Sequence, residues 1–342
     1  MDVVPFEPSH AAEWDRLVAA TPGALVGHDR RWPALFAAAF GHRPLSLVAL
    51  DGERARGVLP LVEIRNWIVG RLIVSLPWLD AAGVCAPDDE ARAALLDAAE
   101  ALARSRGARS LEVRSLAPAP GLDPSSHAKA VLLLPLPESE GAAWDRFDAK
   151  LRNQIRKAER SGLTVEVGGR ELLPAFYDPF SRNMRELGVP VWGLDFYEKI
   201  LSTFRDEADV LIVRDAGEAI GGAILLRWKD AALVPCASSL RARFEKCPNH
   251  ALYWAAIRRA IERGARVFDF GRSTVDSGTY RFKKTWGSEP VLCRWDRPLE
   301  REGAGVSWTT ANPKLRLFVA AWRRLPLSFT RAVGPRIVRN LP

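Results

Sequence analysis

Residues 261–273 read IERGARVFDFGRS and residues 104–115 read RSRGARSLEVRS, so the run Arg-Gly-Ala-Arg occurs twice in the chain. An acidic residue follows each run at the same distance, Glu112 in the first copy and Asp269 in the second. Each copy begins with a helical pattern, continues with a glycine that should end the helix, and closes with a short alternating strand. The two copies therefore indicate one helix-to-strand unit that the chain uses twice.

A second pair of similar segments lies upstream. Residues 47–64, LVALDGERARGVLPLVEI, resemble residues 211–228, LIVRDAGEAIGGAILLRW, and both are typical of a β-hairpin with an acidic-glycine turn. The expected helices follow at 88–106 and 249–263. This order predicts an α/β chain with two similar halves in tandem, each a mixed, mostly antiparallel sheet flanked by helices.

The length and composition agree with this organisation. A chain of 342 residues with 48% hydrophobic and 26% charged residues favours two globular domains. We predict an N-terminal domain at 1–135, a C-terminal domain that carries the site at 136–300, and a basic amphipathic tail at 301–342. The boundary between the two domains is expected in the Pro- and Ser-rich region 117–140.

Several features predict a cytoplasmic protein. The N-terminal sequence MDVVPFEPSHAAEW lacks the cationic start and apolar run of a secretory signal, and no stretch approaches the ~18 apolar residues of a transmembrane helix. The four cysteines, at positions 85, 236, 247 and 293, have no CxxC spacing, which fits a reducing compartment and predicts no metal site. Neither GxGxxG nor GxxxxGK[ST] occurs, so dinucleotide and P-loop chemistry is not indicated.

The positive charge is concentrated in the tail. The net charge is +8, and from Ala304 onward the chain has seven cations and no acid, which leaves +1 for the rest. This distribution argues against a nucleic-acid footprint on the body. The apolar residues among the tail cations predict either peripheral contact of residues 312–342 with the inner membrane face or a C-terminal helix docked on the body. Pro326 and Pro335 should prevent one continuous helix.

Residues 144–168, WDRFDAKLRNQIRKAERSGLTVEVG, combine a helical pattern with many cations. Arg152 and Arg156 lie one turn apart and, with Asn153 and Lys157, could bind an anionic group of a substrate. The alternative is a solvated basic face on an amphipathic helix, which the sequence alone favours.

The stretch FDFGRSTVDSGTYRFKKTWG, residues 268–287, is a second candidate site. Hydroxyl residues and cations surround its glycines, and backbone N–H groups of a glycine-rich turn can converge on an oxyanion. Tyr280 and Trp286 could pack against a substrate ring or anchor the segment in the core. The candidate substrate-binding residues here are Arg272, Ser273, Tyr280, Lys284 and Trp286.

Together, KLRNQIRKAERSGL and FDFGRSTVDSGTYRFKKTWGSEP resemble the FemAB-related branch of the GNAT acyltransferase superfamily. Within it, the chain is most similar to the FemAB-like proteins associated with PEP-CTERM/exosortase and exopolysaccharide systems, over nearly its whole length. The resemblance implies a pair of GNAT-like domains that transfer an acetyl or aminoacyl group to an amine. The acceptor would be a cell-envelope or exopolysaccharide precursor, either a small molecule or a lipid-linked glycan.

The resemblance also implies the donor and some of the site. The donor would be an acyl-CoA or an aminoacyl-tRNA, so tRNA is the one nucleic acid expected as a partner, and no metal is implied. The segment from Tyr280 to Lys283 matches the Tyr-x-Phe-Lys segment near the reaction centre of FemAB-type proteins. One departure is SSLRARFEKCPNHALYW, residues 238–254, which lacks the Gly-rich turn that acyl-CoA-binding GNATs place before a phosphate-binding helix. The candidate cofactor-binding residues there are Arg241, Arg243 and His250, with Asn249 as a helix cap.

Acyl transfer to an amine requires that the amine lose a proton, that the oxyanion be stabilised and that both substrates be aligned. Asp269 is the candidate that accepts the proton or orients the amine, and Lys283 is the candidate that stabilises the oxyanion or a phosphate. Because Glu112 occupies the same place in the first copy, a purely structural role for Asp269 is an equal alternative.

Two other classes of function compete with an acyltransferase. The first is a catalytically inactive binding or scaffold protein of the exopolysaccharide machinery, which the missing Gly-rich turn favours. The second is a nucleic-acid-binding module, which the nearly neutral body disfavours.

Overall fold

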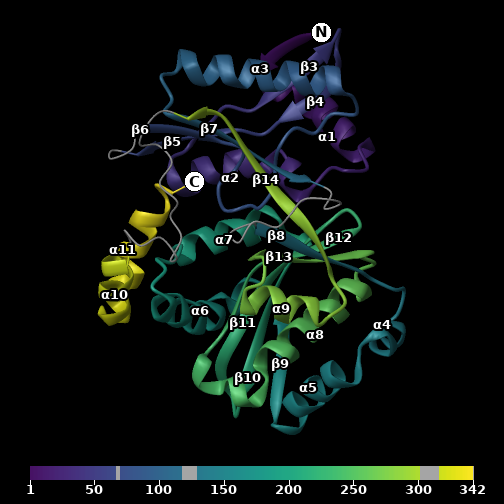
Figure 1. The fold of residues 1–342 in the computed structure, drawn as a ribbon, viewed down its shortest axis with the longest axis vertical. Coiled ribbons are helices and arrows are strands. Elements are labelled where there is room, and N and C mark those ends of the chain that lie inside the picture. The colour runs from purple at the N-terminus through teal and green to yellow at the C-terminus, as the bar shows by residue number, and fades with distance from the viewer. Residues whose placement is uncertain (67–69, 118–128, 301–315, 342) are drawn as a thin grey trace. The chain divides into compact units, whose positions relative to one another are not determined.

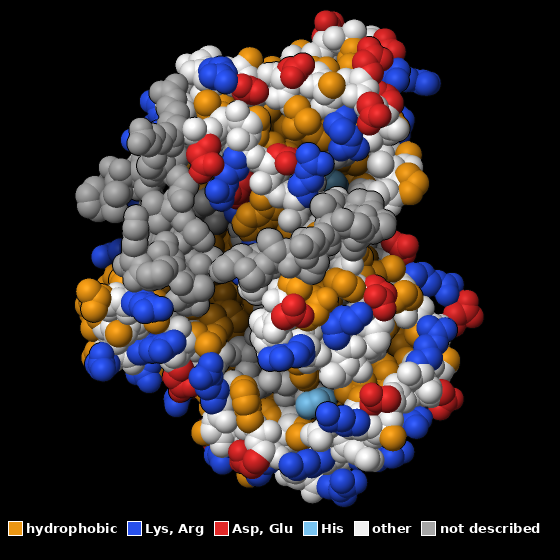
Figure 2. Space-filling model, viewed as in Figure 1, with side chains coloured by type: hydrophobic (Ala, Val, Ile, Leu, Met, Phe, Trp, Pro, Cys, Tyr) orange, Lys and Arg blue, Asp and Glu red, His pale blue; other side chains and the backbone are white. Residues whose placement is uncertain are grey.

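The computed structural model describes residues 1–66, 70–117, 129–300 and 316–341 (Figure 1). The chain forms two compact units. Unit 1 comprises Met1–Ala117, Cys293–Trp308 and Arg339–Pro342, and unit 2 comprises Pro118–Leu292 and Thr309–Val338. Cations and acids are interspersed over much of the face in Figure 2, as the near-neutral charge of the body requires.

The two units differ from the predicted ranges 1–135 and 136–300 at two strands. β8 (Lys129–Pro135) lies in unit 2 because it pairs with β13 (Val267–Thr274). β14 (Glu289–Glu300) begins in unit 2, where its first residues pair with β8, and continues from Cys293 in unit 1. Residues 118–128 of the predicted boundary region and 301–315 of the predicted tail lie outside the described residues.

Unit 1 contains two groups of paired strands, three α-helices and two 3₁₀ helices, Pro8–His10 and Val26–His28, within the described ranges. The α-helices are α1 (Ala11–Ala20), α2 (Arg31–Phe40) and α3 (Asp89–Ser105). One group has the order β1-β3-β4, formed by Asp2–Pro5, Leu47–Asp51 and Arg54–Leu59. The other has the order β2-β5-β6-β7, formed by Arg43–Pro44, Val62–Asn66, Gly70–Val74 and Ser110–Ala117. All pairs are antiparallel except β6 with β7.

The strands of unit 2 lie in the order β14-β8-β13-β12-β11-β10-β9, and β14 takes part through its first residues. Its remaining strands are β9 (Leu163–Gly168), β10 (Ala208–Asp215), β11 (Glu218–Trp228) and β12 (Ala231–Ser239). The helices are α4 (Glu140–Arg146), α5 (Ala149–Arg160), α6 (Leu173–Leu187), α7 (Leu194–Thr203), α8 (Pro248–Glu262), α9 (Gly278–Lys284), α10 (Arg316–Arg324) and α11 (Leu327–Val338). Only β12 and β13 pair in parallel among its described pairs.

The central strands of unit 2 are covered on both faces. Leu211 and Val213 of β10 pack into the core with α5 and α8, whereas the neighbouring residue Ile212 lies on the face of α6, where Gly222 of β11 leaves room for Phe176. Successive side chains of a strand point to opposite faces of the sheet. Leu211, Ile212 and Val213 are nevertheless all fully buried, because helices cover both faces. Figure 1 shows α5 and α8 on one side of these strands and α6 on the other.

The repeat predicted from the sequence is confirmed: the two copies have the same elements and end their helices with the same hydrogen bond. The predicted helices are α3 and α8, and the predicted hairpins are β3–β4 and β10–β11. Gly107 and Gly264 end the two helices with φ of +64° and +78°. In each copy the N–H of the following alanine, Ala108 or Ala265, donates to a carbonyl five residues back at 2.9 Å, as in a Schellman motif. None of the described helices combines the length and apolar character needed to cross a bilayer.

Candidate functional site

The parallel strands β12 and β13 separate soon after they begin. Their ladder ends at the pair Leu233↔Asp269, although both strands continue. β12 has an extra residue against β11 directly after Leu233, and β13 has an extra residue against β8 directly after Asp269. Such bulges bend the strand that carries them, so each strand turns at the point where the pairing stops. We call the separated parts, Val234–Ser239 and Phe270–Thr274, the fork.

Three serine hydroxyls in the strands of the fork are buried and have no hydrogen-bond partner among the described residues: Ser238, Ser239 and Ser273. Buried hydroxyls are nearly always bonded to protein, water or a ligand, so each of these three groups is a candidate for a bond to water or to a bound molecule. Gly221 of β11 makes room for Ser239, because a Cβ there would lie 2.4 Å from Ser239 Oγ. Sequence reasoning selected Ser273 and missed the other two, although paired serines at the end of an apolar strand could have identified them.

In unit 1 the chain itself occupies the corresponding place. β6 and β7 have the same parallel pairing, which ends at Val74↔Glu112, and the segment Ser75–Gly83 then follows β7. The Ser75 N–H donates to Glu112 O at 2.9 Å, and Ser75 Oγ accepts from the Arg114 N–H at 2.7 Å. The Ala82 N–H donates to Arg114 O at 3.0 Å. We call Ser75–Gly83 the plug, because it bonds to the edge of β7 that corresponds to the fork.

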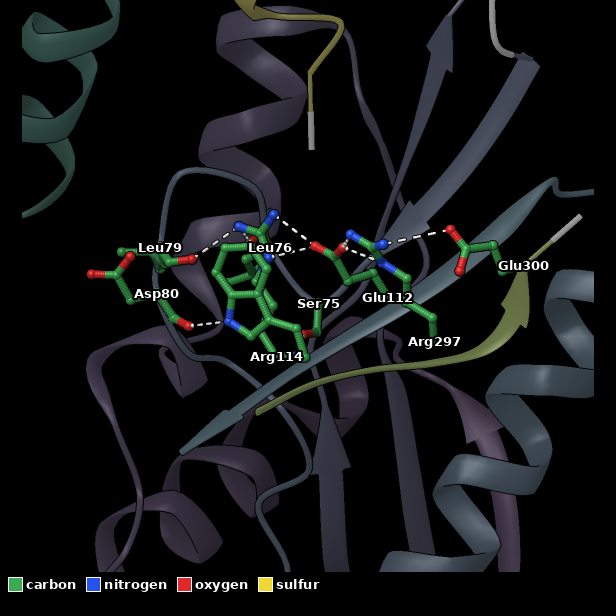
Figure 3. Close-up of polar contacts among 9 residues, drawn as sticks. Ser75, Leu76, Leu79, Asp80, Glu112, Arg114, Arg297 and Glu300 are labelled. Carbon is green, nitrogen blue, oxygen red and sulfur yellow. Dashed lines mark hydrogen bonds and ion pairs between the residues drawn. The ribbon is translucent and has the colours of Figure 1, made fainter. Parts of the chain in front are cut away.

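A buried ionic cluster holds the plug in place (Figure 3). The Arg114 guanidinium donates to the carbonyls of Leu76 and Leu79 at 3.2 and 3.0 Å. It also pairs with Glu112 at 2.8 Å, and Arg297 of β14 donates twice to the second carboxylate oxygen of Glu112. Burial by itself raises the pKa of Glu112, but the charges of Arg114 and Arg297 outweigh it and hold this pKa below its ordinary value.

Aligned on Glu112 and Asp269 without a gap, Gly271 falls opposite Arg114, but β13 has an extra residue at this point, and the pair Arg114-Ser115 of the first copy then recurs as Arg272-Ser273. Gly271 has a φ of +71°, a conformation that favours glycine, and Arg272 after it is exposed, whereas Arg114 is buried. Asp269, the counterpart of Glu112, accepts a hydrogen bond from the Gly271 N–H at 2.7 Å. In the first copy of the repeat the plug therefore bonds to the edge of the parallel strand, whereas in the second copy the two strands separate and form the fork.

The fork leads into the N-terminus of α8. After β12 come the 3₁₀ turn Arg241–Lys246 and Cys247, whose φ of +60° redirects the chain into the helix. Pro248 is the first helical residue, where a missing N–H breaks no helical hydrogen bond. Asn249 lies inside the helix, so the prediction that it caps α8 was wrong. The dipole of α8 favours an anion at this end.

The basic helix α5 lies beside the start of α8. Cys247 Sγ lies 2.8 Å from Gln154 Oε1 and donates its hydrogen to it. Burial raises the pKa of the Cys247 thiol, and the charge of Lys157 partly offsets this rise. A cation of α5 is therefore near the end of α8 that favours anions.

The sequence of α5 explains which of its residues face outward. Asp148 accepts a hydrogen bond from the Leu151 N–H at 2.7 Å and starts the helix. The apolar residues Leu151, Ile155 and Ala158 are buried in the core of unit 2. The predicted substrate-binding residues lie on the remaining faces, Arg152 half-buried and Asn153, Arg156 and Lys157 exposed. The Arg156 guanidinium lies over the Trp144 ring, 5.2 Å from its centroid, which limits its freedom.

Trp286 lies in the core of unit 2, which is the second of the two roles that the sequence left open for it. Its side chain is 2% exposed and packs edge-on against Phe147, with ring centroids 5.4 Å apart. His250 stacks on Trp286 and meets Phe282 edge-on at 5.1 Å. Burial lowers the pKa of His250 to about 4, so its imidazole is neutral at pH 7 and brings no charge to a phosphate.

The two candidate catalytic residues meet at the bulge of β13. Lys283 is buried, and its ammonium donates to Gly271 O at 2.9 Å and to Arg272 O at 3.1 Å. The Asp269 carboxylate accepts a hydrogen bond from the Gly271 N–H. Both side chains therefore fix the backbone at the point where β13 leaves β12.

The residues after Thr274 are a turn and a helix, and the predicted glycine-rich loop was wrong. The Ser277 hydroxyl accepts a hydrogen bond from the Tyr280 N–H at 3.2 Å and caps α9. A small hydroxyl residue before a glycine and two aromatic residues is a helix start that sequence reasoning overlooked. Tyr280 is half-buried, Arg272 is exposed, and Lys284 pairs with Glu289 at 3.3 Å.

The predicted cofactor cations before α8 differ in their surroundings. Arg243 donates to Glu218 at 3.2 Å and lies 3.9 Å from Asp215, which also pairs with Lys246 at 2.8 Å. Arg241 is exposed at the start of the 3₁₀ turn. Of these cations, Arg243 and Lys246 therefore already neutralise acids of the β10–β11 turn.

Part of the chain matches a known protein family. Residues 145–284, which include α5, the fork, α8 and α9, match the family described as an acetyltransferase (GNAT) domain. No curated protein sequence matches the chain.

Solved structures share the fold over most of the chain. FemX superposes with a TM-score of 0.66 and 16% identity, over 85% of this chain and 95% of FemX. A tandem GNAT protein from the clavulanic acid biosynthesis pathway has a TM-score of 0.56 and 15% identity, over 90% and 99%. L-PGS from Bacillus licheniformis has a TM-score of 0.50 and 12% identity, over 94% and 98%. The chain therefore has the predicted tandem α/β fold, similar to FemX and a tandem GNAT protein, and its residues 145–284 match the acetyltransferase (GNAT) domain family.

Proposed function

We propose that the protein is an N-acyltransferase whose acyl donor binds in the fork. One observation carries the proposal: β12 and β13 part after Leu233 and Asp269, within the segment that matches the acetyltransferase family, and leave buried serine hydroxyls without a partner among the described residues. The corresponding edge in unit 1 is bonded to the plug. These features favour unit 2 as the part that binds the donor.

The proposed donor is an acyl-CoA or an aminoacyl-tRNA. Both join an activated acyl group to a part that bears phosphates. An extended donor could bond to the backbone of Val234–Ser239 as an added strand would. Its phosphates would then lie towards the N-terminus of α8, where the helix dipole and the exposed Arg241 favour anions. His250, neutral at pH 7, and Arg243, which is already paired, would contribute by packing and positioning rather than by free charge.

The proposed acceptor is an amine on an anionic precursor of the cell envelope or of an exopolysaccharide, as in PEP-CTERM-associated systems. It would be a small molecule or a lipid-linked glycan that the protein meets in the cytoplasm. The exposed cations of α5 support an anionic acceptor, because guanidinium and ammonium groups bind phosphate and carboxylate well. The residues proposed to contact the acceptor are Arg152, Asn153, Arg156, Lys157, Arg272, Tyr280 and Lys284.

In the proposed reaction the amine nitrogen attacks the acyl carbonyl carbon, and the bond from that carbon to the donor sulfur or ribose oxygen breaks. Asp269 would accept the amine proton, which then passes to the departing sulfur or oxygen. Lys283 would act as a positioning residue, since its bonds to Gly271 O and Arg272 O fix the bulge that carries Asp269. Its positive charge would also favour the oxyanion.

A second candidate function is an inactive binding or scaffold protein that keeps the fork and has lost the chemistry. The connection from Ser238 to Trp254 contains no glycine, and two of its cations, Arg243 and Lys246, already bind acids. This arrangement leaves fewer free groups for the phosphates of a donor than a glycine-rich turn would.

A transfer assay with the purified full chain separates the two candidates. We expect the protein to consume acetyl-CoA or alanyl-tRNA and to acylate at least one amine from a panel of amino sugars, nucleotide-linked amino sugars and lysine-containing peptide precursors. The products are identified by mass spectrometry, and calorimetry measures donor binding separately. Donor binding without acylation of any acceptor would favour the scaffold protein, and failure to bind either donor would contradict the proposal itself.

A further inference from the structure

We propose that the outward faces of α10 and α11 bind a bilayer surface that contains anionic lipids. This inference goes beyond the proposed reaction, since it concerns where the protein works and holds whether or not unit 2 transfers an acyl group. Of the tail predicted to contact the membrane, residues 312–315 and 342 lie outside the described residues, so the proposal rests on residues 316–338.

Each of the two helices packs against α6 with one face. The side chains on the other faces are therefore those that can meet a partner. Val319 and Trp322 of α10 are buried, and Gly188 at the end of α6 has Val319 in direct contact with its backbone. Arg331 of α11 binds Asp178 at 2.6 Å and the Ser181 hydroxyl at 2.8 Å, both on α6. The docked arrangement predicted as one alternative is therefore present, and it leaves the opposite faces of both helices in solvent.

The proline prediction for this region was half right. Pro326 lies between α10 and α11 and separates them, as expected. Pro335 lies inside α11, where its ring removes one helical N–H without ending the helix. The segment thus forms two short helices, each with its own outward face, instead of one long helix.

Large apolar side chains stand on the outward faces. Leu317 of α10 is 86% exposed, and Phe329 of α11 is 47% exposed. Phe318 is also exposed and stacks on Trp322 at 5.4 Å, which connects it to the docked face. Exposed apolar residues of this size on two successive helices are typical of a surface that meets another apolar phase.

The outward faces of the two helices also carry cations. Arg324 shares the outward face of α10 with Leu317, and Arg336 shares that of α11 with Phe329, since these pairs are separated by seven residues, or about two helical turns. Arg316 and Arg323 are exposed as well, and the segment 316–341 contains no Asp or Glu. Figure 2 shows orange and blue side chains together where Figure 1 places these helices.

An anionic bilayer surface fits this combination better than nucleic acid does. Short helices with bulky apolar residues among arginines insert those residues at the headgroup boundary, while the arginines attract anionic lipids. Nucleic acid would bind the cations but offers no place for Leu317 and Phe329. Because the rest of the chain has a net charge of only +1, the attraction would act mainly through this surface.

The test is co-sedimentation of the full chain with vesicles of phosphatidylcholine, alone or with about one-third phosphatidylglycerol. We expect binding to the anionic vesicles and little binding to the neutral ones. The double variants Leu317→Ser with Phe329→Ser, and Arg316→Glu with Arg324→Glu, should each weaken binding about tenfold or more. All four positions are exposed, so these variants should keep the fold, which circular dichroism checks.

The controls use exposed residues elsewhere on unit 2. Phe244→Ser removes an aromatic side chain that is 48% exposed, and Arg205→Glu reverses an exposed cation; neither should change vesicle binding. Absence of binding to anionic vesicles, or equal binding by the tail variants and the wild type, would overturn the proposal. Concentration-dependent self-association that the tail variants abolish, measured by sedimentation velocity without vesicles, would assign the surface to a second copy of the chain and overturn it as well.

Discussion

Glu112→Gln is expected to lower the free energy of unfolding by about 3 kcal/mol, the range found when a buried ion pair loses one partner. The substitution keeps the shape of the side chain but removes the charge that compensates Arg114, which is only 3% exposed. Arg114 in turn holds the carbonyls of Leu76 and Leu79, so the loss should loosen the plug. Urea unfolding followed by tryptophan fluorescence measures the change.

The pH dependence of this effect has a definite sign. The pKa of Glu112 in the folded protein lies below its ordinary value, so the carboxylate stabilises the fold at neutral pH, and this contribution is lost as the pH falls through that ordinary value towards the folded one. The difference between wild type and Glu112→Gln should therefore shrink below about pH 4. Glu166→Gln is the control, because the Glu166–Arg214 pair is largely exposed and should contribute less than about 1 kcal/mol. A Glu112→Gln effect no larger than this control would contradict the role given to the cluster.

Asp269→Asn is expected to lower kcat for acyl transfer by about 100-fold or more, because an amide cannot accept the amine proton. The asparagine oxygen can still accept the hydrogen bond from the Gly271 N–H, so the fold of the bulge should remain. The thermal midpoint should accordingly change by no more than about 3 °C. The measurement is the transfer assay with the donor and acceptor that the wild type uses.

Asp276→Asn serves as the control for Asp269→Asn. Asp276 is an exposed acid in the turn after β13, at a φ of +60° that asparagine tolerates well, and its replacement should leave kcat unchanged. If Asp269→Asn keeps full activity, Asp269 has only the structural role of its counterpart Glu112. Lys283→Ala is a weaker test, since it removes the donor of two backbone carbonyls and should disturb the bulge itself.

The repeat and the fold could be predicted because they depend on local patterns. The glycines after the two helices, the acidic-glycine turns and the Arg-Gly-Ala-Arg runs each act within a few residues of the chain. The structure places them in matching positions, with the same parallel pairing of β6 with β7 and of β12 with β13.

The fork and the plug could not be predicted in this way, since they depend on pairing between distant strands. Whether the ladder stops after Leu233 and Asp269 is decided by bulges against β11 and β8, and a bulge has no reliable sequence signal. The aligned repeats show an extra residue, Gly271, before the second Arg-Ser pair. That Arg114 of the first pair holds the plug could be seen only from its contacts with Leu76 and Leu79.

Burial explains the other differences between the sequence-based expectations and the structure. Trp286, His250 and Lys283 were all assigned to a site because of their chemistry, and all three are packed among aromatic rings or bonded to backbone. The same types of polar and aromatic residue occur near strand ends whether their side chains face a ligand or the core, so residue type alone does not distinguish the two. The roles of the exposed residues of α5 remain predictions.

Hydrogen–deuterium exchange with and without donor tests the central claim most directly. The claim is that the fork of unit 2 binds the acyl donor and that the plugged edge of unit 1 does not. Saturating acetyl-CoA, or alanyl-tRNA if that is the active donor, should slow exchange in peptides that cover Val234–Ser239 and Phe270–Thr274. Exchange in Ser75–Gly83 should stay the same. Protection confined to Ser75–Gly83, or no protection of the fork at a donor concentration that supports turnover, would contradict the claim.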